Sequence, residues 1–200
     1  MIKKLFIAIL VLLHSATVWA FDLGDLSQQL QAPQNIKGQF SQKRYLKNLA
    51  VPITSSGHFI LIPNNALLWQ VKTPFEVTMR IAQNGIEQLN NNNQWIRADS
   101  SAGGEATQLK LFLGLLGGQT TALESQFKLS LEGEAEQWKL LLQPKTKLLE
   151  QIFTQIDIAG DEVVREINLQ EAQGDRTAIT FENTQINSDL DSIEQATLLP

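Results

Sequence analysis

Alternating apolar and polar residues mark three consecutive strands in the first half of the chain. Residues 59–62 form a short apolar run, residues 67–71 alternate apolar with polar side chains, and residues 75–82 alternate again up to the pair Asn84-Gly85. Side chains alternate between the two faces of a strand, and an Asn-Gly pair after an alternating segment is a strong hairpin signal. The pattern predicts an antiparallel sheet with one apolar and one polar face.

The two faces of this predicted sheet are occupied by different residues. The apolar face holds Leu67, Trp69, Val71, Phe75, Val77, Met79 and Ile81. The polar face holds Gln70, Lys72, Glu76, Thr78 and Arg80. Such an apolar face has to be covered, either by the protein's own core or by a bound apolar ligand.

Strand patterns continue on both sides of this region, and helical patterns are short. Further strands are expected at residues 37–46, 86–89, 94–97, 127–131, 138–142, 153–159, 163–170 and 177–182. Asp22 is expected to cap a helix with Leu23, Leu26 and Leu30 on one face. No alternation of strands with long helices is present, so the sheet is predicted to be antiparallel and the chain mainly β, in the α+β class. The tail from Asn183 is polar and is expected to end in irregular structure.

The segment 106–116 is apolar on nearly every side and lies between Gly103-Gly104 and Gly117-Gly118. A helix that is apolar all round must be buried or must face a hydrophobic ligand. It is therefore either ordinary core that plugs one end of a barrel or a mobile lid with glycine hinges. A second short helix is expected to start at Thr121, because Thr121 and Glu124 have capping-box spacing.

The N-terminal segment has the order of a secretory signal peptide. Lys3-Lys4 precede an apolar run over residues 5–13, and Val18 and Ala20 have the spacing of a cleavage site. Nine apolar residues in a row are few for crossing a bilayer, although an uncleaved anchor helix is the alternative. We therefore expect residues 1–20 to be removed and residues 21–200 to fold as a single domain, soluble in the periplasm.

Charge and residue types argue against several functions. Cleavage would remove Lys3 and Lys4 from the 16 basic residues and none of the 21 acidic ones, so the net charge would change from −5 to −7. Nucleic acid is therefore an unexpected partner, since its binding depends on Lys and Arg. The chain has no cysteine, which excludes disulfides and a lipidated N-terminal cysteine. His58 would be the one remaining histidine, and the nucleophile and zinc motifs of hydrolases are missing. We expect no catalytic residues, no metal and no cofactor.

Residues at several loosely spaced positions match the sequence pattern of one protein family. They are Gly38-Gln39-Phe40-Ser41-Gln42, Gly57-His58-Phe59, Pro63, Leu67-Leu68-Trp69, Pro74 and Asn84-Gly85. In this order they are similar to the LolA family of periplasmic lipoprotein carriers. The resemblance implies an unclosed antiparallel half-barrel whose short helices form a lid over a hydrophobic cavity. It also implies a monomeric carrier that shields acyl chains, receives lipoproteins from an inner-membrane transporter and delivers them to an outer-membrane acceptor.

Three other functions remain open at this point. The chain could carry a different lipid, such as a glycolipid, a polyene ester or a fatty acid, without a lipoprotein role. A hydrolase or isomerase of lipids would need a polar constellation inside the cavity, and none is visible in the sequence. A purely structural module would have a filled core.

The resemblance and the strand pattern together place the lipid site on the apolar face and on the lid. The expected lipid-binding residues are Phe59, Leu67, Trp69, Val71, Val77, Met79, Ile81, Leu109, Phe112, Leu113 and Leu116. One position departs from the family pattern. Well-known members have an arginine directly before the proline of the turn, where it holds the lid by hydrogen bonds, whereas this chain has Ile62. Lid control or cargo should therefore differ.

Overall fold

The computed structural model describes residues 20–82, 85–97, 111 and 113–198. Its helices are α1 (Leu23–Gln31), α3 (Thr120–Glu124), α4 (Lys147–Glu150) and α5 (Ser192–Leu198). Its strands are β1 (Ile36–Tyr45), β2 (Ile53–Ile62), β3 (Ala66–Thr73), β4 (Val77–Ala82), β5 (Gly85–Leu89), β6 (Trp95–Arg97), β7 (Phe127–Glu134), β8 (Gln137–Pro144), β9 (Phe153–Gly160), β10 (Val164–Glu171) and β11 (Arg176–Ile186). Residues 111 and 113–116 are also helical.

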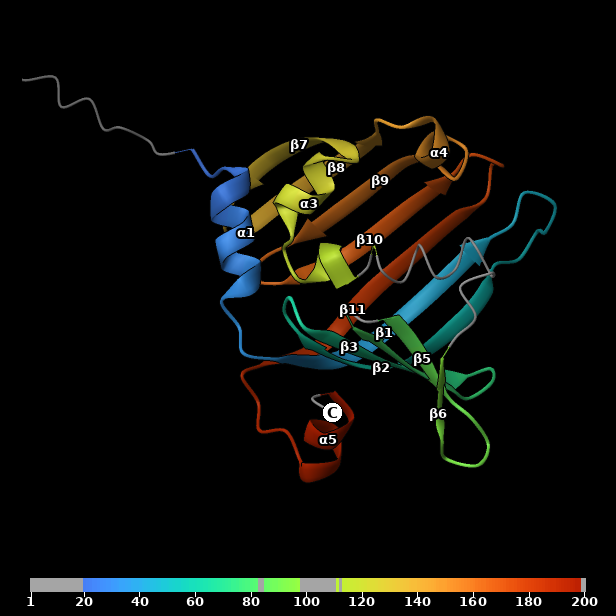
Figure 1. Cartoon of the computed structure of the whole chain (residues 1–200). Coiled ribbons are helices and arrows are strands. Elements are labelled where there is room, and N and C mark those ends of the chain that lie inside the picture. The colour runs from blue at the N-terminus through green and yellow to red at the C-terminus, as the bar shows by residue number, and fades with distance from the viewer. Residues whose placement is uncertain (1–19, 83–84, 98–110, 112, 199–200) are drawn as a thin grey trace, which may run out of the picture.

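The strands form one antiparallel sheet that does not close into a barrel. Its order is β6-β5-β4-β3-β2-β1-β11-β10-β9-β8-β7, so that β6 and β7 are its two edges. The sheet is strongly curved, with α1, α3 and the helical residues 111 and 113–116 on its concave side and α5 beneath its outer side (Figure 1). The predicted fold class, an unclosed antiparallel half-barrel with short helices, is confirmed.

Helix α1 begins as the sequence predicts, whereas α3 does not. The Asp22 carboxylate accepts hydrogen bonds from the backbone N–H groups of Gly24 (2.7 Å) and Asp25 (2.9 Å). Helix α3 instead starts at Thr120, and no side chain caps it. The predicted capping box at Thr121 is wrong, because Thr121 already lies inside the first turn, while a cap residue must be outside it.

Phe75 does not share the apolar face predicted for it. The last residue pair between β3 and β4 is Val71 with Val77, so Phe75 lies in the turn between these strands. Its side chain is 78% exposed. The apolar–polar alternation in the sequence therefore begins two residues before β4 begins at Val77. Phe75 and Glu76 belong to the turn, because the chain needs these residues to reverse direction.

The concave face is the main apolar core. Its centre is an aromatic cluster in which Phe40 stacks on Trp69 at 3.7 Å between ring centroids. Phe59 and Phe181 meet edge to face at 5.1 Å. These four rings come from β1, β2, β3 and β11. Large buried aromatic side chains supply much of the apolar area that stabilises a core. These four rings therefore pack the central strands together on the concave side of the sheet.

The outer face is not uniformly polar, and residues 192–198 of the tail form a helix, so both predictions are wrong. Ile60, Ala66 and Leu68 are buried on the outer side together with Leu198 of α5. Arg80, expected on a wet face, is 8% exposed and is bonded to the Glu87 carboxylate (2.5 Å) and the backbone carbonyl of Thr197 (2.7 Å). Helix α5 therefore covers the outer side of β2 and β3. The apolar contacts of α5 offset the conformational entropy lost when the tail becomes ordered.

Candidate functional site

The structure brings together most of the residues that the sequence proposes for lipid binding. Across the β3–β4 ladder Leu67 faces Ile81, Trp69 faces Met79 and Val71 faces Val77. The cluster of the concave face contains Phe59, Leu67, Trp69, Ile81, Leu113 and Leu116, with Val71 and Met79 packed against it. Leu109 and Phe112 lie outside the described residues.

Burial along this face changes from one end of the strands to the other. Leu67 and Ile81 are completely buried and Trp69 is 3% exposed, whereas Val71, Val77 and Met79 are only half-buried. Leu67 lies near the β2–β3 turn, and Val71 and Val77 lie next to the β3–β4 turn. The concave face is thus closed at one end of β3 and β4 and more accessible at the other.

A small apolar pocket lies on the helical side of the concave face. It has a volume of about 280 Å³ and is lined by Leu111, Gly114, Gln119, Ala122, Leu123, Gln126 and Leu149. These residues come from the helical residues 111 and 113–116, from α3 with its flanks and from α4. Ligand pockets usually have volumes of about 300 to 1,000 Å³, so this pocket suits part of a lipid rather than a whole one.

The end of the helical segment 113–116 is fastened to α1 at Gly118. The backbone carbonyl of Gly118 accepts hydrogen bonds from Ser27 Oγ at 2.7 Å and from Gln31 Nε2 at 2.9 Å. Gly118 has a φ of +67°, and a Cβ there would lie 2.7 Å from the Cβ of Leu30. Only glycine adopts this conformation without strain and permits so close an approach. We call the Ser27, Gln31 and Gly118 contact the latch.

Sequence reasoning missed the latch, although it expected that Ile62 could not hold the helical segment as the family arginine does. Along β2, Phe59 and Leu61 belong to the concave cluster, whereas Ile60 and Ile62 pack with the outer cluster under α5. Ile62 therefore points away from the helical segment. The signal that could have found the latch is the pair Ser27 and Gln31, one helical turn apart on the side of α1 that carries Leu30.

Helix α1 is itself anchored to two turns of the sheet. Gln29 Nε2 donates to the carbonyl oxygens of Ala135 (3.0 Å) and Asp161 (2.5 Å). Trp138 Nε1 also donates to the Asp161 carbonyl. Burial alone would raise the pKa of the Asp161 carboxyl, but hydrogen bonds from Arg165 and the Val163 N–H, with the Arg165 charge, lower it below its usual range. Because Gln29 is hydrogen-bonded to both turns, α1, which carries Ser27 and Gln31 of the latch, is held in place against the sheet.

Removing the latch should make the helical segment open more often. We expect the double variant Ser27→Ala, Gln31→Ala to speed amide exchange at Gly117 and Gln119, whose N–H groups donate to Leu113 and Gly114. Each lost hydrogen bond is worth about 0.5 to 1.5 kcal/mol, so the loss of two predicts amide exchange faster by a factor of roughly 5 to 150. Gln28→Ala, an exposed position on the same helix, is the control. Unchanged exchange in the double variant would show that apolar packing alone holds the segment.

No group of three or more His, Cys, Asp or Glu side chains in the described part of the chain is placed to hold a metal ion. His58 is exposed on β2. None of the helices in the described residues is both long enough and apolar enough to cross a membrane.

The chain matches one protein family over most of its length. The family model described as outer membrane lipoprotein carrier protein LolA matches residues 31–193. No curated protein sequence matches the chain.

Solved structures with a similar arrangement have very low sequence identity. A LolA superfamily protein from Nitrosomonas europaea is 9% identical with a TM-score of 0.49, and the match covers 86% of this chain and 95% of that one. In a MucA/MucB complex from Pseudomonas aeruginosa the matched chain is 12% identical with a TM-score of 0.48, and the match covers 86% of this chain and 58% of that one. A putative outer membrane lipoprotein-sorting protein domain from Vibrio parahaemolyticus is 8% identical with a TM-score of 0.35, covering 84% and 94%.

Proposed function

This chain belongs to the LolA family of outer membrane lipoprotein carrier proteins. On that premise we propose that it binds acyl chains against its concave face and carries the lipid or lipoprotein that bears them across the periplasm. The observation that carries the proposal is an apolar concave face, half-accessible at Val71, Val77 and Met79, that is covered by a separately fastened helical segment. The proposed lipid site comprises the residues predicted from the sequence, including Leu109 and Phe112.

Binding a whole acyl chain requires the helical segment to move. The pocket of about 280 Å³ is too small for a lipid, and the deep end of the concave face at Leu67 and Ile81 has no exposed surface. Lifting residues 111 and 113–116 would expose the apolar side chains below them. The two hydrogen bonds at Gly118 are a modest barrier to this movement.

Cargo held in this way would need partners for loading and release. Burial of about 16 methylene groups is worth roughly 12 kcal/mol before ordering costs are subtracted. An acyl chain held so tightly would not leave at a useful rate by itself. We therefore propose an inner-membrane transporter as donor and an outer-membrane acceptor, with the carrier itself a monomer and not an enzyme.

A second candidate function is transport of a different lipid without a lipoprotein role. The position of Ile62 favours this alternative, because Ile62 packs under α5 and cannot hold the lid as the family arginine does. Control of the lid would then rest on the latch at α1. The cargo could accordingly be a glycolipid, a polyene ester or a free fatty acid.

Native mass spectrometry of protein purified from cells tests the proposal directly. Co-purified species with the mass of an acylated peptide favour a lipoprotein carrier, and species with the mass of a simple lipid favour the alternative. A protein that carries no acyl species, and that also fails to bind a fluorescent fatty acid in solution, would contradict both.

Processing of the N-terminus is a separate prediction. We expect cleavage after Ala20, because Lys3-Lys4, the apolar run over residues 5–13 and the Val18-x-Ala20 spacing form a signal peptide. N-terminal sequencing of the protein from the periplasmic fraction should begin at Phe21. Recovery of a chain that still starts at Met1, or of a cytoplasmic protein, would contradict this prediction.

A further inference from the structure

Large apolar side chains that are exposed gather at one rim of the curved sheet. Of the seven such side chains in the described residues, five lie in or beside connections at that rim: Leu49, Val51, Ile53, Phe75 and Leu148. Phe75 is 78% and Val51 73% exposed. A protein does not gain stability from apolar side chains so far out in water, and their location at one end of the sheet indicates a contact surface.

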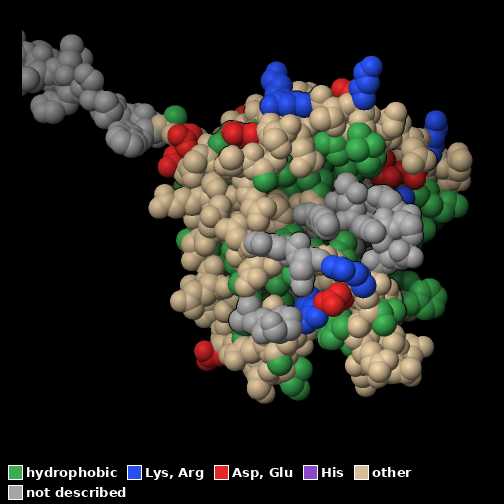
Figure 2. Space-filling model, in the orientation of Figure 1, with side chains coloured by type: hydrophobic (Ala, Val, Ile, Leu, Met, Phe, Trp, Pro, Cys, Tyr) green, Lys and Arg blue, Asp and Glu red, His purple; other side chains and the backbone are tan. Residues whose placement is uncertain are grey.

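Topology brings these connections to the same end of the sheet. The strands run antiparallel in the order β4-β3-β2-β1-β11-β10-β9-β8, so the β1–β2, β3–β4 and β8–β9 connections all leave it on one side. The Ser56 and Thr73 hydroxyl oxygens, 2.7 Å apart, join β2 and β3 near this end. Figure 1 shows the β1–β2 loop and α4 at the right of the molecule, and Figure 2 shows apolar side chains protruding along that edge. We call this end the apolar rim.

Basic residues accompany the apolar rim. Lys47, Lys145 and Lys147 are exposed in its connections, and Lys72 lies just before the β3–β4 turn. Acidic residues are present too, since Glu76 pairs with Lys72, Asp175 lies near Arg44, and Glu150 follows Lys147.

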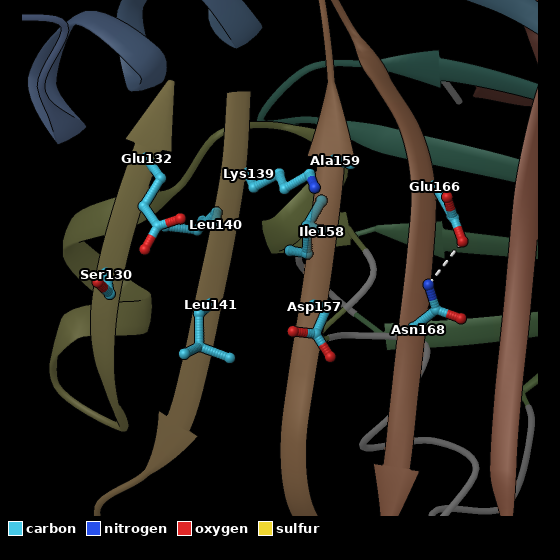
Figure 3. A pocket seen from close by; sticks show the side chains of 10 residues that line it. All are labelled: Ser130, Glu132, Lys139, Leu140, Leu141, Asp157, Ile158, Ala159, Glu166 and Asn168. Atoms are coloured by element: carbon cyan, nitrogen blue, oxygen red, sulfur yellow. Dashed lines mark hydrogen bonds between the residues drawn. The ribbon is translucent and has the colours of Figure 1, made fainter. Parts of the chain in front are cut away.

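The opposite end of the sheet has a different character. Glu134 ends β7 and Glu136 lies in the β7–β8 turn, and the β9–β10 turn carries Asp161 and Glu162. Neither turn contains Lys or Arg, and Arg165 of β10 pairs with Asp161 at 2.9 Å. On the outer side of β7 to β10 a groove of about 350 Å³ adds Glu132, Asp157 and Glu166, partly offset by Lys139 (Figure 3). An anionic surface would consequently attract the apolar rim and repel the opposite end.

We propose that the apolar rim docks on the surface of a bilayer that contains anionic lipid. Phe75 and Val51 would enter the headgroup region, and Lys47, Lys145 and Lys147 would face the phosphates. Apolar side chains at protruding tips beside lysines are the combination that holds proteins at a membrane interface. A protein partner is disfavoured, since the tips are separate protrusions from different hairpins rather than one groove or flat face.

Docking at this rim would place the accessible end of the concave face next to the acyl layer. Val71 and Val77 are the last pair of the β3–β4 ladder before the turn that carries Phe75. This consequence rests on the proposed carrier function. The docking itself does not, because the exposed side chains at the rim lie outside the proposed lipid site.

Vesicle co-sedimentation of the processed protein tests the docking. We expect the protein to bind vesicles of phosphatidylethanolamine with about a quarter phosphatidylglycerol, and to bind pure phosphatidylcholine vesicles more weakly. Phe75→Ser should weaken binding about tenfold, because one large apolar side chain no longer leaves water. Lys47→Glu should weaken binding to the anionic vesicles specifically.

The matched control is Ile193→Ser on α5, since Ile193 is 76% exposed but lies away from the rim. It should bind vesicles like the wild type. No binding of the wild-type protein to protein-free vesicles, equal binding to the two vesicle types, or equal weakening by Ile193→Ser would each overturn the proposal. Fatty-acid binding measured without vesicles is a separate readout, whose loss would contradict the carrier function and leave the docking result standing.

Discussion

Glutamate in place of Met79 is expected to leave the protein folded while lowering its affinity for a fluorescent fatty acid about 100-fold. Met79 is half-buried and lies directly across from Trp69 on the concave face. A carboxylate there keeps part of its water in the ligand-free protein. An acyl chain lying over it would remove that water without supplying a partner, which costs several kcal/mol. Fluorescence titration beside thermal unfolding measures both effects.

The control for this substitution is Thr78→Glu. Thr78 is the neighbouring residue of β4, is also half-buried and points to the outer side of the sheet. It should change neither fold nor binding appreciably. A folded Met79→Glu protein with unchanged affinity would remove the accessible end of the concave face from the lipid site.

Glutamate in place of Leu67 is expected to act on the fold itself. Leu67 and its partner Ile81 are 0% exposed, so the new carboxylate would be buried in the closed protein. Burying an uncompensated charge costs several kcal/mol, and a domain has only about 5 to 15 kcal/mol of stability. Urea unfolding of Leu67→Glu should show loss of most of the unfolding free energy.

Leu67→Met tests whether the effect comes from charge rather than from any change at this position. Methionine has a similar volume, so the cost should stay below about 1.5 kcal/mol. A Leu67→Glu protein as stable as the wild type would mean that water reaches the deep end of the concave face. The cavity would then extend along the whole of β3.

Much of the sheet and of the proposed site could be predicted from the sequence, because strand periodicity is a local property. The alternation at Leu67, Trp69 and Val71 placed these residues on one face, and the β3–β4 ladder pairs them with Ile81, Met79 and Val77 as expected. The capping of α1 by Asp22 is equally local. The family resemblance then supplied the expectation of an open barrel, which periodicity does not contain.

Burial along the same residues could not be predicted. Leu67 and Val71 have the same pattern in the sequence, yet Leu67 is fully buried and Val71 is only half-buried. The difference arises because Gly117 packs near the Pro63 and Asn64 turn and closes only that end. Such packing joins residues far apart in the chain.

The amino-acid sequence by itself determined which side chains share a face of each strand, since the two-residue period of an extended backbone follows directly from residue order. Only the tertiary structure decided what covers each face. Two contacts show this: α5 buries Ile60 and Leu68, and the latch joins α1 to Gly118. Both join segments more than 80 positions apart in the chain, such as Ser27 and Gly118 at a separation of 91. The same holds for the apolar rim, where Phe75, Val51 and Leu148 lie at one end of the sheet only because antiparallel pairing returns alternate hairpins to that end.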